Sequence, residues 1–133
     1  MLRAVADTHA VIWYLYDDPR LSGSARALIE EAAMAGDQIA ISAITLAEIV
    51  YLSEKGRIDR EALDRVLTAL SEPESVIREL PLDRTVIAVM ASIDRNEVPD
   101  LPDRIIAATA RLHDVPVISR DRQIRLSNVD TVW

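Results

Sequence analysis

The sequence predicts an α/β protein in which a parallel sheet is covered by helices on both faces. Short apolar runs typical of buried strands alternate with longer segments that have helical periodicity. Strands that alternate with helices in this way form parallel sheets through right-handed crossovers. A chain of 133 residues suits one domain and is long enough to bury a core. We therefore expect a single domain over residues 1–133.

Five strands are expected from apolar runs that are bounded by polar or turn residues. The run "LRAVA" is followed by an aspartate, and the runs "QIAIS" and "VPVIS" each end on a serine. Runs of this length with such boundaries fit the buried strands of a parallel sheet. The expected strands span residues 2–6, 38–42, 75–80, 115–119 and 129–133.

Local signals mark the helices between these strands. Ser22 is a suitable N-cap, and Gly36 stands where a left-handed residue ends a helix. The "DDP" at 17–19 stops the first helix, and the "VPDLPD" at 98–103 interrupts the chain before the last one. The expected helices span residues 8–16, 25–35, 45–55, 60–70, 83–95 and 104–112.

The composition excludes several kinds of site. The chain has no cysteine, so disulfides, thiolate metal sites and cysteine nucleophiles are absent, and two separated histidines argue against a histidine-rich zinc site. No apolar run reaches the roughly 18 residues of a membrane span, and the N-terminus has no secretion-type pattern. We therefore expect a soluble cytoplasmic protein without membrane contact. The net charge of −7 argues at face value against nucleic-acid binding, which needs Lys and Arg on phosphate.

Four acidic residues stand where the predicted strands end or helices begin. Asp7 follows the first strand, and Asp121 lies two residues past the fourth. Glu48 lies one turn into the helix after the second strand, and Asp103 opens the last helix. Ligands of open parallel sheets bind outside the carboxyl ends of the strands. We therefore expect these four side chains to face one site.

Each of these acids also has an ordinary explanation. Asp7 can cap the helix that begins at Thr8, and "TLAE" at 45–48 matches a capping box. Asp103 fits a first-turn acid with Asp100 as the cap, and Asp121 fits a turn. The chain contains 22 acidic residues, so the pattern alone leaves coincidence open.

If the four carboxylates converge, their repulsion must be offset, and hard divalent cations with oxygen ligands are the usual solution. Mg²⁺ or Mn²⁺ is favoured over zinc because the candidate ligands are carboxylates, hydroxyls and water. Such cations activate water and stabilise the charge that develops when a phosphodiester is attacked. They also attract phosphate, which answers part of the objection from net charge.

Four segments in order carry a resemblance to a known family. "DTHAVIW", "ISAITLAEI", "DLPDRIIAATA" and "PVISRD" together resemble the PIN-domain ribonucleases, most closely the VapC-type toxins of bacterial toxin–antitoxin pairs. The similarity extends along essentially the whole chain, to the closing "VDTVW". It implies a PIN-like three-layer α/β/α sandwich with a five-stranded parallel sheet in the order 3-2-1-4-5. The "DLPD" at 100–103 differs from many relatives, which have proline directly after the first aspartate, but Asp103 stays in register.

The resemblance assigns roles to individual residues. The family's catalytic, metal-binding acids match Asp7, Glu48, Asp103 and Asp121. Ser119 matches a small hydroxyl residue near the metal, and Thr8 and Thr45 are suited to orienting carboxylates. Arg104 is expected to contact the substrate phosphate or to pair with a neighbouring acid. For an RNA-facing basic patch the candidates are Arg120, Arg122 and Arg125, for which a solvated surface is an equally simple interpretation.

The resemblance implies an Mg²⁺- or Mn²⁺-dependent endoribonuclease toxin that hydrolyses single-stranded or looped RNA, is inhibited by a small antitoxin and forms a homodimer. Two non-catalytic alternatives stay open. One is a receiver-like regulatory domain, which needs a lysine after a late strand, whereas the single lysine, Lys55, lies in the helix after the second strand. The other is a PIN domain that has lost activity and serves only for binding.

Overall fold

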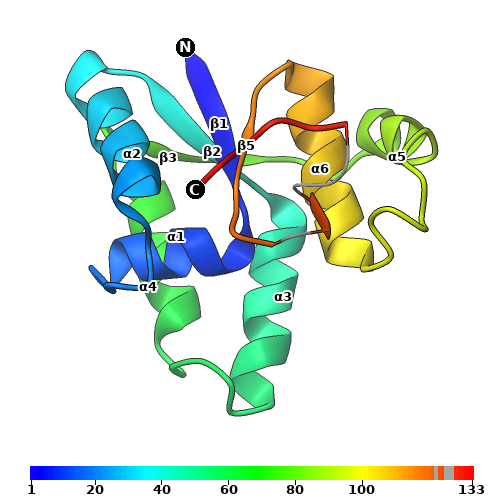
Figure 1. Cartoon of the computed structure of the whole chain (residues 1–133). Helices are drawn as coiled ribbons and strands as arrows, with labels where there is room; N and C mark the ends of the chain where they lie inside the picture. The colour runs from blue at the N-terminus through cyan, green and yellow to red at the C-terminus, as the bar shows by residue number, and fades with distance from the viewer. Residues whose placement is uncertain (122, 125–127) are drawn as a thin grey trace.

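A computed structural model describes residues 1–121, 123–124 and 128–133. Its centre is a five-stranded parallel sheet in the order β3-β2-β1-β4-β5, which confirms the predicted fold class and strand order (Figure 1). The strands are β1 (Leu2–Ala6), β2 (Gln38–Ser42), β3 (Ile77–Leu80), β4 (Val117–Ile118) and β5 (Thr131–Val132). The helices of the described residues are α1 (Thr8–Leu15), α2 (Gly23–Ala35), α3 (Ala43–Glu54), α4 (Ala62–Ser71), α5 (Arg84–Met90) and α6 (Leu101–His113). None of them is long and apolar enough to cross a membrane.

The buried parts of the central strands are mainly apolar because helices cover both faces of the sheet. In β1, Ala4 and Ala6 belong to a core shared with α1, α2 and α4, whereas Val5 belongs to a second core shared with α5 and α6. In β4, Ile118 and Val117 divide between the same two cores. Figure 1 shows the two groups of helices on opposite sides of the sheet, with α3 running away from the carboxyl end of β2.

Most helix ends follow the predicted capping residues. The Ser22 side chain accepts a hydrogen bond from Ala25 N, and Gly36 ends α2 with a φ of 73°, a left-handed conformation that glycine adopts without a steric penalty. The helix after β2 begins at Ala43, two residues earlier than expected, because Ser42 caps it by accepting from Ile44 N.

The expectation for α5 was wrong at its C-terminal end, because the helix stops at Met90 and not at residue 95. At this end, two side chains donate hydrogen bonds to backbone carbonyl groups. The Ser92 hydroxyl donates to Val89 O at 2.6 Å, and the Arg104 guanidinium donates to Met90 O at 3.2 Å and to Ile93 O at 3.0 Å. Because these carbonyls have side-chain donors, they do not require the backbone N–H groups of a further helical turn.

Candidate active site

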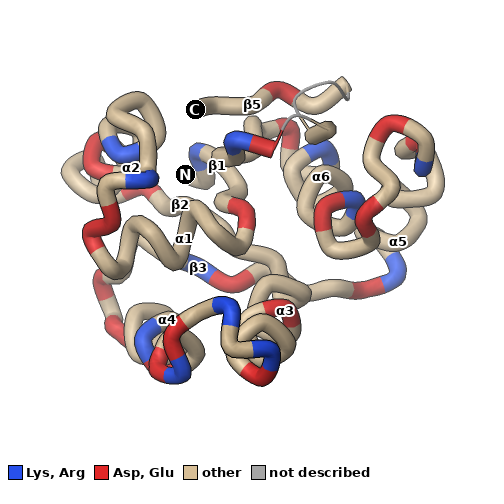
Figure 2. The backbone as a smooth tube through the Cα atoms, turned by 60° about the horizontal axis from the view of Figure 1, so that its bottom comes forward, with Lys and Arg blue, Asp and Glu red and all other residues tan. Residues whose placement is uncertain are grey.

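A cavity of about 460 Å³ opens at the carboxyl ends of β1 and β4. Five carboxylate side chains stand in its wall, namely those of Asp7, Glu48, Asp100, Asp103 and Asp121. They come from separate parts of the chain, and Figure 2 shows acidic positions on both α3 and α6. The structure thus brings the four acids singled out in the sequence to one cavity, together with a fifth, Asp100.

Asp7 is fixed at the junction of β1 and α1. Its backbone N–H donates to Ile118 O at 3.0 Å, which joins the end of β1 to the end of β4. Its side chain accepts from Ala10 N at 2.9 Å, so Asp7 does cap α1 as the ordinary explanation expected. Burial raises the pKa of Asp7, against the lowering effects of hydrogen bonds from Ser119 and Ala10. One carboxylate therefore caps the helix and also faces the cavity.

Ser119 connects Asp7 with Asp121. The Ser119 side chain is fully buried, hydrogen bonds with the Asp7 carboxylate and accepts from Asp121 N at 2.9 Å. Asp121 Oδ1 in turn accepts from Gln123 N at 2.8 Å and from Ile124 N at 3.3 Å. Asp121 is thus the turn residue that its sequence context suggested, and this turn holds its carboxylate in the cavity wall.

Glu48 is held by threonines and does not form a capping box. Ser42 is the N-cap of α3, so Thr45 lies inside the helix, where it is fully buried. The Thr8 hydroxyl donates to Glu48 Oε1 at 2.5 Å and lies 3.3 Å from Thr45 Oγ1. Burial is the main cause that raises the pKa of Glu48, and the charges of Asp100 and Asp7 add to it. Thr8 thus contacts Glu48 directly, and Thr45 contacts Thr8 from inside α3.

Asp103 has a strongly perturbed carboxyl group. Its backbone N–H donates to the side chain of Asp100 at 3.0 Å, because Asp100 is the N-cap of α6. Burial, followed by the negative charges of Asp100, Asp121, Glu48 and Asp7, raises the pKa of Asp103 to about 8. These charges act on Asp103 across the cavity, so the acids form one electrostatic unit.

Arg104 does not face the cavity, which corrects its assignment as a phosphate contact or as the partner of an acid. Its guanidinium donates to the carbonyl oxygens of Met90 and Ile93. Within the described residues its Nε is buried and has no hydrogen-bond partner. Arg104 is therefore a structural residue that joins the start of α6 to the end of α5.

Two other arginines stand in the cavity wall, Arg57 and Arg120. The Arg120 guanidinium lies 4.6 Å from the ring centre of Trp13, and Trp133 packs on the same ring at 5.8 Å. Within the described part of the chain neither arginine forms an ion pair. Arg122 and Arg125, the other candidates for a basic patch, lie outside the described residues. Arg57 could not be predicted from the sequence, because its approach to the cavity depends on the turn that follows α3.

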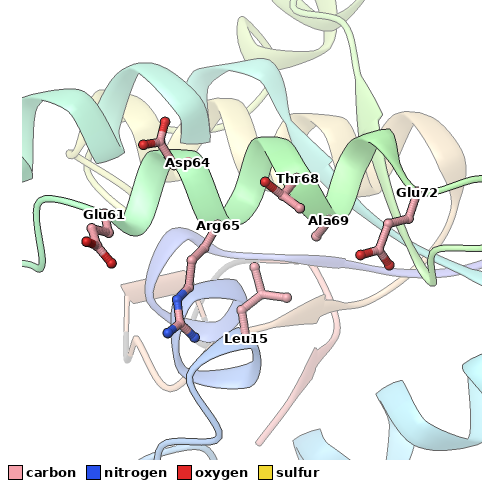
Figure 3. A pocket seen from close by; sticks show the side chains of 7 residues that line it. All are labelled: Leu15, Glu61, Asp64, Arg65, Thr68, Ala69 and Glu72. Atoms are coloured by element: carbon pink, nitrogen blue, oxygen red, sulfur yellow. The ribbon is translucent and has the colours of Figure 1, made fainter.

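A separate groove of about 450 Å³ runs along α4. Figure 3 shows its wall, in which Glu61 and Glu72 lie at opposite ends of the helix and the Arg65 side chain reaches towards Leu15. Because its acids are spread along the helix, this groove lacks the clustered carboxylates of the cavity beside β1. We therefore place the candidate active site at the acidic cavity.

The donor set of the acidic cavity fits a hard divalent cation. It consists of carboxylates with nearby hydroxyl groups and has no sulfur ligand, which is the combination that Mg²⁺ and Mn²⁺ prefer. The pKa values of Asp7, Glu48 and Asp103 are raised because burial and neighbouring negative charges disfavour their ionised forms, and a bound cation would favour them. Within residues 1–121, 123–124 and 128–133, no three acidic or histidine side chains are arranged closely enough to coordinate an ion as they stand.

The sheet order, together with acids from β1, α3, α6 and the turn after β4 around one cavity, defines a PIN-like α/β protein. The chain matches the PIN domain family over residues 4–130 and belongs to that family. It is a homologue of VapC-type ribonuclease toxins. It is 30% identical to Ribonuclease VapC22 of Mycobacterium tuberculosis over 125 residues, which cover 94% of this chain and 92% of that protein.

Solved structures show the same fold. VapBC2 from Rickettsia felis, bound to a DNA fragment from its promoter, matches with a TM-score of 0.70 at 19% identity, over 98% of this chain and 97% of that one. FitAcB from Neisseria gonorrhoeae matches with a TM-score of 0.64 at 23% identity, over 98% and 96% of the two chains. A toxin–antitoxin complex from Klebsiella pneumoniae is 29% identical, with a TM-score of 0.57 over 89% and 86%.

Proposed function

We propose that this protein is a cytoplasmic endoribonuclease toxin of a type II toxin–antitoxin pair, formed by one PIN domain over residues 1–133. It hydrolyses RNA phosphodiester bonds with Mg²⁺ or Mn²⁺ and leaves 5′-phosphate and 3′-hydroxyl ends. The observation that carries this proposal is the gathering of acids from four segments in one cavity, where the pKa of Asp103 rises to about 8. Membership of the PIN family and the similarity to a ribonuclease support it.

In this proposal Asp7, Glu48, Asp103 and Asp121 hold the cation. When bound, the cation supplies Lewis acidity that activates water and stabilises negative charge on the phosphodiester. The hydrogen bond from Thr8 fixes one oxygen of Glu48, and Thr45 supports Thr8 from within α3.

Ser119 fixes Asp7 relative to Asp121 through its two hydrogen bonds. A carboxylate that is already oriented loses less conformational freedom when it binds a ligand, so these hydroxyls position the acids for a cation.

Two arginines in the cavity wall supply the positive charge that an anionic substrate needs on an acidic protein. The net charge of −7 repels RNA at long range, but Arg57 and Arg120 stand at the cavity itself. An arginine in the cavity wall can contact a phosphate that is bound there through two parallel hydrogen bonds. We include Arg120 among the RNA contacts and add Arg57 to them.

A cleavage assay tests the proposed activity. Purified protein is incubated with total RNA in Mg²⁺ or Mn²⁺, and a parallel sample receives EDTA. We expect cleavage that EDTA stops, and cleavage that survives EDTA would remove the metal mechanism. No cleavage with either metal would favour the alternative of a PIN domain used only for binding. The receiver-like alternative has lost its support, because its required lysine is absent from the cavity and Lys55 is the C-cap of α3.

The proposed partners are a small antitoxin protein and a second copy of this chain. The similar solved structures from Rickettsia felis and Klebsiella pneumoniae are described as VapBC2 and as a toxin–antitoxin complex, which supports an antitoxin. We expect the chain to inhibit growth when it is expressed alone, and co-expression of the neighbouring gene to restore growth. Equal growth in both conditions, with active enzyme present, would argue against a toxin. Light scattering of the purified chain tests the dimer.

A further inference from the structure

A second cavity, of about 510 Å³, adjoins the acidic cavity. The two cavities share three wall residues, His9, Trp13 and Arg57. A ligand that is bound at the acids and extends past these residues therefore enters the second cavity. Its remaining wall includes Tyr16 and Arg20. Its volume falls within the range of about 300–1,000 Å³ that is common for small-ligand sites.

Among the described residues in the wall of the second cavity, one of the two arginines is not paired with an acid. Asp18 is paired with Arg20, whose Nη2 lies 2.8 Å from Asp18 Oδ2. Asp59 accepts hydrogen bonds from Glu61 N at 3.0 Å and from the Tyr16 hydroxyl at 3.2 Å. Within the described part of the chain, the Arg57 side chain forms no hydrogen bond or ion pair. The wall shared with the acidic cavity therefore carries a guanidinium that is free to bind an anion.

The same wall offers one exposed ring, that of His9, supported by a buried one. The His9 ring is exposed and lies 5.5 Å from the ring of Trp13, tilted by 47°. The Trp13 ring is almost fully buried and has the guanidinium of Arg20 at 5.0 Å, so it is fixed in place. Proteins bind single-stranded nucleic acid by combining such ring surfaces for bases with cations for phosphates.

We propose that this second cavity is a nucleotide subsite that binds the nucleotide next to the scissile bond of a single-stranded RNA. Arg57 contacts the phosphate between the two cavities, and His9, supported by Trp13, stacks on the base. The inference rests on the proposed nuclease function and adds to it the place where the neighbouring nucleotide lies. It implies that cleavage requires at least one unpaired nucleotide on that side of the bond.

The test uses Arg57→Gln with Arg60→Gln as the matched control. Arg60 is exposed, lies three residues further along the chain and contributes to neither cavity, so both variants lose the same charge from the same segment. Binding of a fluorescent single-stranded oligoribonucleotide is measured in Mg²⁺, with Glu48→Gln in every protein to suppress hydrolysis. We expect Arg57→Gln to weaken binding about tenfold and to reduce the salt slope by about 0.7, the value for one phosphate contact on a single strand. Arg60→Gln should stay within about twofold.

The base contact is tested with oligonucleotides that carry one abasic position beside the cleavage site. The abasic position should weaken binding about tenfold on one side of the bond only. This penalty should disappear in His9→Ala and persist in His9→Phe, which keeps a ring. A role of His9 in stability alone would change the melting temperature without affecting the abasic penalty.

The outcomes separate the subsite from the proposed function. Cleavage by the parent, with Arg57→Gln binding RNA as well as Arg60→Gln does, would overturn the subsite and leave the nuclease intact. Selective loss of RNA binding in Arg57→Gln, with no cleavage by the parent, would refute the nuclease and with it the placement beside a scissile bond, and would leave the second cavity as an RNA-binding site only. If Arg57→Gln weakens only the antitoxin complex, the second cavity is a protein-docking site and the proposal fails.

Discussion

Neutralising Asp103 should stabilise the metal-free protein, and the gain should grow with pH. The pKa of this carboxyl is raised from 3.8 to about 8 in the folded protein. Between these values the folded state holds a proton that the unfolded chain has released, so each rise in pH favours unfolding. The stability provided by this proton is complete below about pH 4 and is lost as the pH approaches 8. Asp103→Asn has no proton to lose and should not show this decline.

The structure sets the size of the effect. Four pKa units correspond to about 5–6 kcal/mol if nothing relaxes, since one unit is worth about 1.4 kcal/mol. Asp103 is partly exposed and its neighbours share the titration, so solvent screening reduces the gain to about 1–3 kcal/mol. For a domain of this size that gain raises the melting temperature by about 4–10 °C. The helix cap is unaffected, because it uses only the backbone N–H of Asp103.

The assay compares thermal melts in EDTA at pH 5 and pH 8. Asp64→Asn is the control, because Asp64 is also a first-turn acid but lies in α4, outside the acidic cavity. We expect the control to follow the parent and Asp103→Asn to gain over both at pH 8. Adding Mg²⁺ at pH 8 should raise the melting temperature of the parent more than that of Asp103→Asn. The cation relieves repulsion between the carboxylates, and the variant has already lost part of this repulsion together with one potential ligand. Parallel decline of the parent and Asp103→Asn from pH 5 to pH 8 would refute the electrostatic account.

Three further predictions concern the acids and the residues that hold them. Asp7→Asn, Glu48→Gln and Asp121→Asn should each lower RNA cleavage by about 100-fold or more, because ligands of one cation act as a unit; near-parental rates in two of them would contradict the assignment. Thr8→Val should lower cleavage by about 10- to 100-fold, whereas Thr8→Ser keeps the hydroxyl that bonds Glu48 and should retain activity in the same assay. Arg104→Ala should lower the free energy of unfolding by about 2–4 kcal/mol without changing the salt dependence of RNA binding, as denaturation and anisotropy titrations can show.

The strand pattern of this chain could be predicted because both faces of the sheet are covered. The buried part of each central strand, such as residues 4–6 of β1 or Val117–Ile118 of β4, is therefore an apolar run, and the polar residues that follow it lie at the carboxyl edge of the sheet. This is why Asp7 and Asp121 could be placed at one edge from the sequence alone. The end of α5 could not be predicted in this way, because it depends on hydrogen bonds from Arg104, which lies more than ten residues further along the chain.

Four acids and Arg120 of the candidate site could be predicted from the sequence, whereas Arg57 and Trp133 could not. The acids follow strands or begin helices, so their positions depend on local structure. Arg57 has no such local signal, because it reaches the cavity only through the packing of the turn after α3. Trp133 reaches the same wall from the last strand, 120 residues along the chain from Trp13, whose ring it contacts. Long-range packing of this kind leaves no pattern in a single sequence.

The neighbouring pair Asp103 and Arg104 shows how the fold tolerates a cluster of like charges. Asp103 faces the acids, while Arg104 points the other way and joins α6 to the carbonyls at the end of α5. Asp100 caps the same helix, Ser119 hydrogen bonds with Asp7, and Thr8 donates to Glu48. Each of these contacts fixes a segment that carries an acid, so repulsion cannot be relieved by moving the segment away. Burial, together with a smaller contribution from this repulsion, raises the pKa values of Asp7, Glu48 and Asp103, which leaves a proton or a cation as the means to neutralise the cavity.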